Sequence, residues 1–237
     1  MIAERGRQPA VLPGPAVGAG AQLVQLSLLS IGWGLGPVGW LAGITYGLIS
    51  SALLTSALRR SPAGRFGPAD AVTLGRSTLV GSVTALVAAD LGGTSAVPAL
   101  LVSLATVALI LDAVDGWVAR RTATTSELGA RFDMEVDAFL IAVLSVYLAP
   151  SLGAWVLVIG AMRYAFVGAG WALPWLRALL PPSIARKVVA AVQGIALTAA
   201  SADVLGRPLE LVLVGLALAL LVWSFGRDVA WLWRVRS

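Results

Sequence analysis

A succession of apolar segments, each about as long as one membrane crossing, constrains the fold of this chain more than any other feature. No charged residue occurs in the 37 positions from Gln22 to Leu58, and six further apolar segments follow. Because a bilayer core takes roughly 20 apolar residues per helical crossing, we predict an all-α, polytopic membrane protein. One or two N-terminal apolar helices precede a six-helix core at about 71–91, 96–119, 128–149, 152–173, 184–204 and 209–233.

The composition agrees with this fold class. Only 12% of the residues are charged, whereas soluble domains have about 25%. The chain has no His and no Cys, which excludes disulfides, thiol nucleophiles and the usual zinc ligands. The formal net charge of +5 does not indicate a nucleic-acid partner, because Arg residues at the cytoplasmic ends of membrane helices account for it.

The N-terminal part of the chain differs from the core. Residues 1–21 are rich in Pro and Gly, and we expect a flexible tail there, since Pro interrupts the apolar stretch that a signal peptide needs. Residues 22–66 hold extra apolar sequence and a basic loop, with a turn signal at 34–37. Either this region crosses the membrane twice, or only 38–58 crosses and the earlier part lies in the interface. The membrane domain itself is expected over 67–237.

The basic residues predict the orientation of the helices. With the loop after Arg59 and Arg60 inside the cell, alternating crossings leave only Arg207 outside. This asymmetry is what the positive-inside rule expects. We expect a multi-pass protein of the plasma membrane with its active site at the cytoplasmic face. Its later cytoplasmic basic residues are Arg120, Arg121, Arg131, Arg177, Arg186, Lys187, Arg227, Arg234 and Arg236.

Acidic residues cluster at the predicted cytoplasmic ends of two consecutive crossings. Asp112 and Asp115 are three residues apart and share a helix face. Asp133 and Asp137 are four residues apart and share a face of the next helix, whereas Glu135 lies off that face. Ionisable residues in membrane segments are costly and mark functional sites by default. The two Asp pairs are therefore the candidate site.

Four carboxylates in one pocket repel one another unless cations neutralise them. Oxygen ligands without His or Cys select hard ions, namely Mg²⁺ or Mn²⁺, with Ca²⁺ also possible. Four Asp residues offer enough ligands for two ions, and a pair of divalent cations suits phosphoryl transfer because it stabilises both the attacking and the leaving oxygen. We therefore predict a site for Mg²⁺ or Mn²⁺, with two ions.

Small residues lie between the acidic ones. Gly116, Ala119 and Gly129 would leave the backbone accessible to a bulky ligand, and Arg120 would reach a phosphate oxygen with its planar guanidinium group. Each has a structural alternative. The small residues also suit close helix packing, and Arg120 also suits a cytoplasmic anchor.

Together these residues form the pattern Asp112-x2-Asp115-Gly116-x2-Ala119-Arg120-x8-Gly129-x3-Asp133-x3-Asp137. This pattern resembles the signature of the CDP-alcohol phosphotransferases, or CDP-alcohol phosphatidyltransferases, at all eight fixed positions and with the family's spacing. The six core crossings are also similar to the membrane core of that family. The resemblance covers roughly 70% of the chain.

The resemblance implies an integral membrane enzyme that moves a substituted phosphate from a CDP-alcohol, usually CDP-diacylglycerol, to an acceptor hydroxyl and releases CMP. It also implies a homodimer. Metal ligation would fall to Asp112, Asp115 and Asp133. Asp137 would be both a metal neighbour and the general base. The nucleotide would lie against Asp112, Gly116, Ala119 and Gly129, with its diphosphate near Arg120.

A second, weaker resemblance precedes the first core crossing. Asp70-x2-Thr73-x2-Arg76 is similar to an Asn-x2-Thr-x2-Arg pattern of the family, with Asp70 in place of the Asn. Thr73 is accordingly a candidate for binding the CDP-alcohol.

Basic residues further along the chain are candidates for binding the acceptor. Arg163 falls within an apolar segment, where an unpaired cation is costly, and Arg186 and Lys187 begin the next segment. These residues would suit a phosphorylated acceptor, and members of the family place basic residues in this region. The alternatives are a salt bridge from Arg163 to a pocket acid and cytoplasmic anchoring by Arg186 and Lys187. The sequence does not identify the acceptor.

Two other functions are compatible with intramembrane acids. A cation-coupled or proton-coupled transporter would place such acids near the bilayer midplane, whereas here they lie at one end of their helices. A non-catalytic scaffold would be expected to have lost at least one of the four Asp residues, and none is missing. The transferase is therefore the leading hypothesis.

Overall fold

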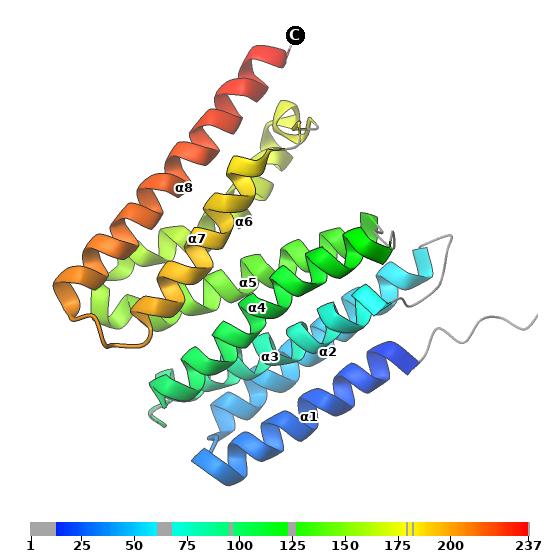
Figure 1. The fold of residues 1–237 in the computed structure, drawn as a ribbon, viewed down its shortest axis with the longest axis vertical. Coiled ribbons are helices and arrows are strands. Elements are labelled where there is room, and N and C mark those ends of the chain that lie inside the picture. Colours follow the sequence, from blue (N-terminus) through cyan, green and yellow to red (C-terminus); the bar gives the residue numbers. More distant parts are fainter. Residues whose placement is uncertain are drawn as a thin grey trace, which may run out of the picture. The chain divides into compact units, whose positions relative to one another are not determined.

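The computed structural model describes residues 13–60, 68–94, 97–122, 127–178, 180–181 and 183–236; within these helices, the side chains of 13–15, 57–60, 68–70, 115–122 and 127–131 are not described. All regular structure among the described residues is helical, which confirms the predicted all-α fold (Figure 1). The α-helices are α1 (Pro13–Trp33), α2 (Pro37–Arg60), α3 (Pro68–Leu91), α4 (Pro98–Thr122), α5 (Glu127–Leu152), α6 (Leu157–Ala172), α7 (Ile184–Ala200) and α8 (Arg207–Val235). Two short 3₁₀ helices, η1 (Ala154–Val156) and η2 (Pro174–Arg177), flank α6.

Proline marks the start of several of these helices. Pro37, Pro68 and Pro98 are the first residues of α2, α3 and α4. Proline is tolerated there because the first N–H groups of a helix have no partner within the helix. The same rule corrects one expectation, since residues 13–21 are not a flexible tail but the beginning of α1. Pro13 and Pro15 lie in its first turn, where they interrupt no hydrogen bond.

The charge-free N-terminal region forms two helices rather than one. α1 and α2 are separated by a short turn in which Gly34 has φ +72°, a backbone conformation that glycine adopts without steric cost. Their apolar stretches, 16–33 and 37–56, are 18 and 20 residues long. Both are long enough to cross a membrane, in agreement with the first of the two readings of this region.

Among the described residues, six helices are long and apolar enough to span a bilayer: α1, α2, α3, α5, α8, and η1 together with α6. The two other α-helices, α4 and α7, have apolar stretches shorter than 18 residues. The apolar part of α4 covers 98–114 because its last turns carry acidic and basic residues, and α7 has 17 residues. In order and position, α3 to α8 correspond to the six predicted core segments.

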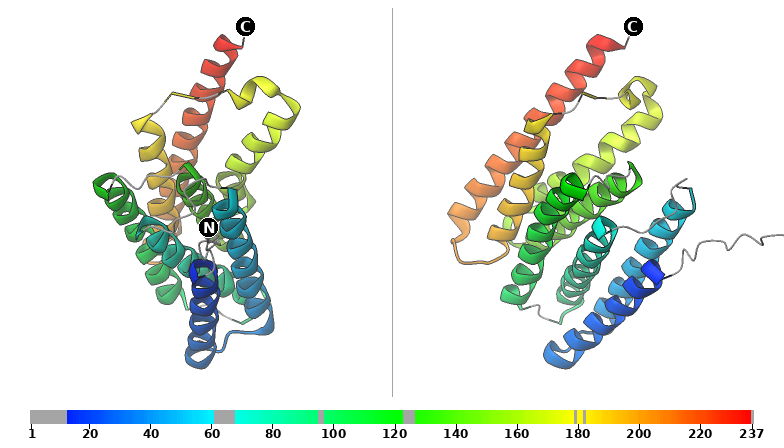
Figure 2. Two further views of the ribbon diagram at one scale, coloured as in Figure 1. Left: turned by 90° about the vertical axis from the view of Figure 1, so that its right-hand side faces the viewer. Right: turned by 45° about the vertical axis from the view of Figure 1, so that its right-hand side comes forward.

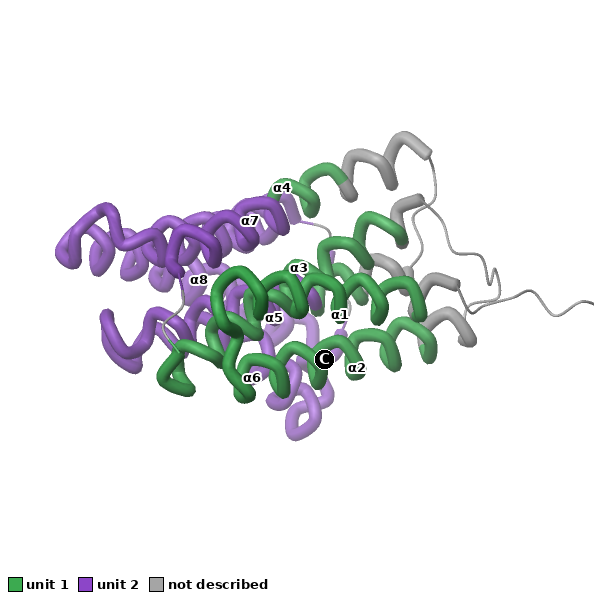
Figure 3. Tube along the Cα trace, turned by 90° about the horizontal axis from the view of Figure 1, so that it is seen from below, with its two compact units in different colours: residues 1–94, 110–135 green, residues 95–109, 136–237 purple. Residues whose placement is uncertain are grey.

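The chain forms two compact units (Figure 3). Unit 1 contains residues 1–94 and 110–135, and unit 2 contains 95–109 and 136–237. In unit 1, α1 and α2 pack against each other and against α3. α3 is the central helix of this group, because 67% of its apolar stretch is buried, against 22% for α1 and 17% for α2.

Glycines bring α2 close to its neighbours in unit 1. Gly39, Gly43 and Gly47 recur every four residues and so line one face of α2. A Cβ atom at Gly39 would lie 2.8 Å from the carbonyl oxygen of Ala85 in α3, and one at Gly43 would lie 3.1 Å from the Cβ of Ala85. Small residues of this kind allow membrane helices to approach closely. The N-terminal hairpin is thus tightly packed against α3.

In unit 2, α7 and α8 lie side by side and are joined by the loop at 201–206 (Figures 1 and 2). Gln193 of α7 is buried, and its side-chain nitrogen donates a hydrogen bond of 2.8 Å to the backbone carbonyl of Ala217 in α8. Such polar contacts between membrane helices stabilise their association. The pair holds the N-terminus of α7 beside the later turns of α8, where a charged cluster is found.

Candidate active site

Arg76 is the most deeply buried charged side chain that the structure describes. It projects from α3 and is 1% exposed. Its guanidinium group pairs with the carboxylates of Asp112 in α4 and Asp133 in α5, the latter at 2.6 Å, and it also donates a hydrogen bond of 2.9 Å to the backbone carbonyl of Asp133. A planar guanidinium group suits this role because its donors diverge in fixed directions. Arg76 therefore joins α3 to the parts of α4 and α5 that belong to unit 1.

The carboxylates of Asp112, Asp133 and Asp137 come together. One ligand oxygen from each lies within 4.8 Å of the others, and all three side chains are half-buried. Asp137 follows Asp133 by one turn of the uninterrupted α5, so that helix places the two carboxylates on one face. The predicted convergence of the two acidic segments is thus seen for three of the four Asp residues.

This group of carboxylates fits a hard divalent cation. Mg²⁺ and Mn²⁺ favour oxygen ligands, and the three Asp residues offer such ligands within a few ångströms. With Arg76 included, these four side chains carry a formal charge of −2, which one divalent ion would balance. Each carboxylate has two oxygens, so pairing with Arg76 leaves Asp112 and Asp133 able to bind a cation as well.

Of the remaining residues of the predicted donor and metal site, the structure describes the side chain of Thr73. Thr73 is buried on α3, one turn before Arg76. The side chains of Asp115, Gly116, Ala119, Arg120 and Gly129 lie outside the described residues, so their proposed roles stay predictions.

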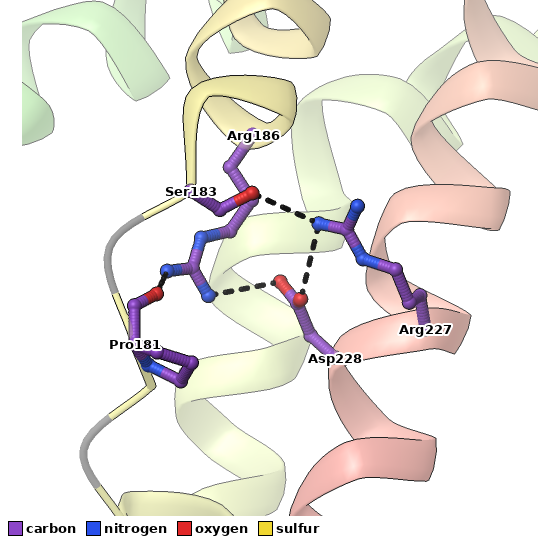
Figure 4. Close-up of polar contacts among 5 residues, drawn as sticks. All are labelled: Pro181, Ser183, Arg186, Arg227 and Asp228. Carbon is purple, nitrogen blue, oxygen red and sulfur yellow. Dashed lines mark hydrogen bonds and ion pairs between the residues drawn. The ribbon is translucent and has the colours of Figure 1, made fainter.

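A second polar cluster lies in unit 2, where α7 begins beside α8 (Figure 4). Asp228 of α8 pairs with Arg186 of α7 at 3.4 Å and with its chain neighbour Arg227 at 3.5 Å. Arg227 donates a hydrogen bond of 3.3 Å to the hydroxyl of Ser183, and Arg186 donates one to the carbonyl of Pro181. Two guanidinium groups thus converge on one carboxylate, which leaves a net positive charge.

The other predicted acceptor residues lie in the same unit. Lys187 is exposed beside Arg186, and Arg163 is half-buried on α6. Sequence reasoning counted Arg227 only as a cytoplasmic cation and did not single out Asp228. A usable signal was present, because both charges fall inside the apolar segment 209–233, where charged residues are rare.

The profile of the CDP-alcohol phosphatidyltransferase family matches residues 67–223, about two thirds of the chain. This stretch contains α3 to α7, most of α8 and every residue of the acidic motif. The chain belongs to the CDP-alcohol phosphatidyltransferase family and is a multi-pass membrane protein of the transferase class. No curated protein and no solved structure gave a significant match.

Proposed function

We propose that the protein is a metal-dependent enzyme of phospholipid biosynthesis. In this proposal it transfers the phosphatidyl group of CDP-diacylglycerol to the hydroxyl of an anionic acceptor and releases CMP. The observation that carries the proposal is the group of Asp112, Asp133 and Asp137 beside buried Arg76, inside the region that matches the family. A donor with two acyl chains also suits a protein built of membrane-spanning helices, because such a donor is held in the bilayer.

The proposed metal ligands are Asp112, Asp115, Asp133 and Asp137. Bound Mg²⁺ or Mn²⁺, with two ions expected, would supply positive charge that stabilises the diphosphate oxygens as the donor is cleaved. Arg76 carries a fixed positive charge among the same carboxylates and limits their mutual repulsion. It thereby keeps the ligands together.

Asp137 is the proposed general base. The oxygen of the acceptor hydroxyl forms a bond to the phosphorus of the phosphatidyl group, while the bond from that phosphorus to the bridging diphosphate oxygen breaks. The hydroxyl proton passes to the Asp137 carboxylate, and CMP leaves with the electrons of the broken bond. A positioned base of this kind contributes about 10²- to 10⁴-fold to the rate.

The donor-binding residues are proposed from the motif. Gly116, Ala119 and Gly129 would let the cytidine nucleotide lie against the helix backbones, and Arg120 would contact the diphosphate. Thr73 lies on α3 one turn before Arg76. This position supports a donor-binding role close to the carboxylates.

The acceptor is proposed to carry a phosphate or a similar anionic group. Among the residues that the structure describes, Arg186 and Arg227 share one counter-ion, Asp228, at 3.4 and 3.5 Å, so their cationic donors are only partly compensated. Guanidinium groups bind phosphate oxygens through paired hydrogen bonds. Lys187 and Arg163 would add charge to this acceptor site.

The sequence supports three finer statements, which we add to the proposal. The protein resides in the plasma membrane, its active site opens at the cytoplasmic face, and it works as a homodimer. The orientation of the active site rests on the distribution of Arg and Lys, and the homodimer rests on the resemblance to the family.

Purified full-length protein in detergent, given CDP-diacylglycerol, tests the proposed reaction. CMP release is measured with Mg²⁺, with Mn²⁺ or with EDTA, and with glycerol 3-phosphate, inositol 1-phosphate, inositol, serine or phosphatidylglycerol as acceptor. We expect CMP only with a divalent ion, and faster release with a phosphorylated acceptor than with serine or inositol. Activity that persists in EDTA would contradict the proposed metal dependence, and the absence of CMP with every acceptor would contradict the reaction.

Replacing Arg227 by Gln should raise the KM for the acceptor by about 10-fold or more while the KM for CDP-diacylglycerol changes little. The reason is the loss of charge-assisted hydrogen bonds, each worth about 1.5–3 kcal/mol. Steady-state kinetics with each substrate varied in turn measures the effect. Arg234→Gln is the matched control, because it removes an exposed cation from the last turn of the same helix. Equal effects of the two substitutions would indicate a general charge effect instead.

A further inference from the structure

Two hydroxyl groups of α2 lie within hydrogen-bonding distance of a buried hydroxyl of α3. The α3 hydroxyl belongs to the residue that follows Arg76. Ser77 is 2% exposed. Its hydroxyl lies 3.2 Å from the hydroxyl of Tyr46 and 2.8 Å from that of Ser50. Tyr46 and Ser50 are four residues apart and therefore lie on the same face of α2. All three residues belong to unit 1, together with Arg76, Asp112 and Asp133.

Helix geometry connects this cluster of three hydroxyls to the carboxylates. Ser77 is the chain neighbour of Arg76, so a local twist of α3 at Ser77 passes directly to the guanidinium group, whereas the turns between take up part of a change several residues further along the helix. The helix backbone has a radius of about 2.3 Å and the Arg side chain extends well beyond it, so a rotation of about 10° displaces the guanidinium group by roughly 1 Å. A displacement of that size is large for a functional site, where about 0.5 Å is tolerated.

The contact comes from a part of the chain that the family profile does not match. The profile begins at residue 67, whereas Tyr46 and Ser50 lie in α2, which ends at Arg60. The close packing through Gly39 and Gly43 holds α2 against α3. The N-terminal hairpin is therefore built onto the helix that carries Arg76.

We propose that Tyr46 and Ser50, acting through Ser77, are positioning residues that fix the rotation of α3 and so hold Arg76 between Asp112 and Asp133. In this role the N-terminal hairpin is part of the support of the active site rather than an independent membrane anchor. The inference rests on the proposed function in so far as the carboxylates bind a divalent ion. Removing a group that hydrogen-bonds metal ligands directly, as Arg76 does, typically lowers metal affinity by 10- to 100-fold. The loss of hydroxyls that act through Arg76 should fall at the lower end of that range.

Two matched Ser→Ala substitutions in α3 test the proposal. Ser77→Ala removes the hydroxyl beside Arg76. Ser82→Ala removes a hydroxyl that is equally buried and donates 2.9 Å to Gln25 of α1, but it lies six positions beyond Arg76. The affinity for Mn²⁺ is measured on full-length protein in detergent from the free-ion signal in electron paramagnetic resonance. We expect about a 10-fold weaker affinity in Ser77→Ala and less than a 2-fold change in Ser82→Ala.

A second pair of variants tests the hydroxyls of α2 themselves. Tyr46→Phe/Ser50→Ala should weaken Mn²⁺ binding as Ser77→Ala does, and Tyr46→Phe/Ser50→Thr, which keeps one hydroxyl, should restore part of the affinity. Thermal unfolding in EDTA accompanies each measurement and identifies a variant that has lost its fold. Unchanged Mn²⁺ affinity in a folded Ser77→Ala protein, or equal losses in Ser77→Ala and Ser82→Ala, would overturn the proposal. The failure of the proposed reaction is distinguishable, because it would appear as wild-type protein that binds Mn²⁺ but releases no CMP.

Discussion

Replacing Asp137 by Asn should lower CMP release by about 10²-fold or more, in line with the contribution of a general base, while binding of CDP-diacylglycerol changes by less than about 3-fold. The amide has nearly the shape of the carboxylate but cannot take a proton from the acceptor hydroxyl. The measurements are single-turnover CMP release at saturating metal and equilibrium binding of the CDP-lipid by the same preparation. A rate within 10-fold of wild type would end the assignment of Asp137 as the base.

Glu135→Gln is the matched control for this substitution. It makes the same change from carboxylate to amide on the same helix, two positions away, at an exposed side chain. Successive helical residues point in different directions, so residues two apart do not share a face. We expect CMP release by this variant to stay within about 2-fold of wild type. A comparable loss in both variants would mean that the charge of the α5 terminus, rather than the Asp137 carboxylate, governs the rate.

The helices and the acidic motif could be predicted because each depends on a pattern among residues that are close together in the sequence. An apolar stretch of roughly 20 residues predicts a crossing without any knowledge of its neighbours, and spacings of three and four predict a shared face. These rules identified the six core segments and the convergence of Asp112 with Asp133 and Asp137. The prediction was wrong at residues 13–21, where the Pro-rich composition suggested a flexible tail. Pro13 and Pro15 instead both lie in the first turn of α1.

The contacts that hold the site together could not be predicted in the same way, because their partners are far apart in the chain. Arg76 lies 36 positions before Asp112 and 57 before Asp133. The Thr73-x2-Arg76 pattern includes this arginine but does not predict which side chains it contacts. Likewise Tyr46 and Ser77 are 31 positions apart. Interhelical packing, and not a spacing within one helix, decides which of these side chains meet.

The buried position of Arg76 between two carboxylates makes the stability of the metal-free site depend on it. Its two partners cannot both lose their counter-ion without a cost, since two carboxylates would then face each other across a partly dehydrated space. Removing one partner of a buried ion pair typically costs about 3–5 kcal/mol. The lower end applies here, because the carboxylates of Asp112 and Asp133 are 38% and 32% exposed and water screens part of their charge.

Replacing Arg76 by Gln should therefore lower the unfolding temperature in EDTA by about 6–12 °C, since about 3 kcal/mol corresponds to 2–4 °C per kcal/mol in a chain of this size. Saturating Mn²⁺ should recover part of the loss, because an ion that binds only the folded state stabilises it. The shift on adding Mn²⁺ should nevertheless be smaller in Arg76→Gln than in wild type, because carboxylates that Arg76 no longer positions bind the ion more weakly. Arg76→Lys, which keeps the charge but not the divergent donors, should fall between the two. An Arg76→Gln protein that unfolds at the wild-type temperature in EDTA would show that Asp112 and Asp133 do not depend on Arg76 for their charge balance.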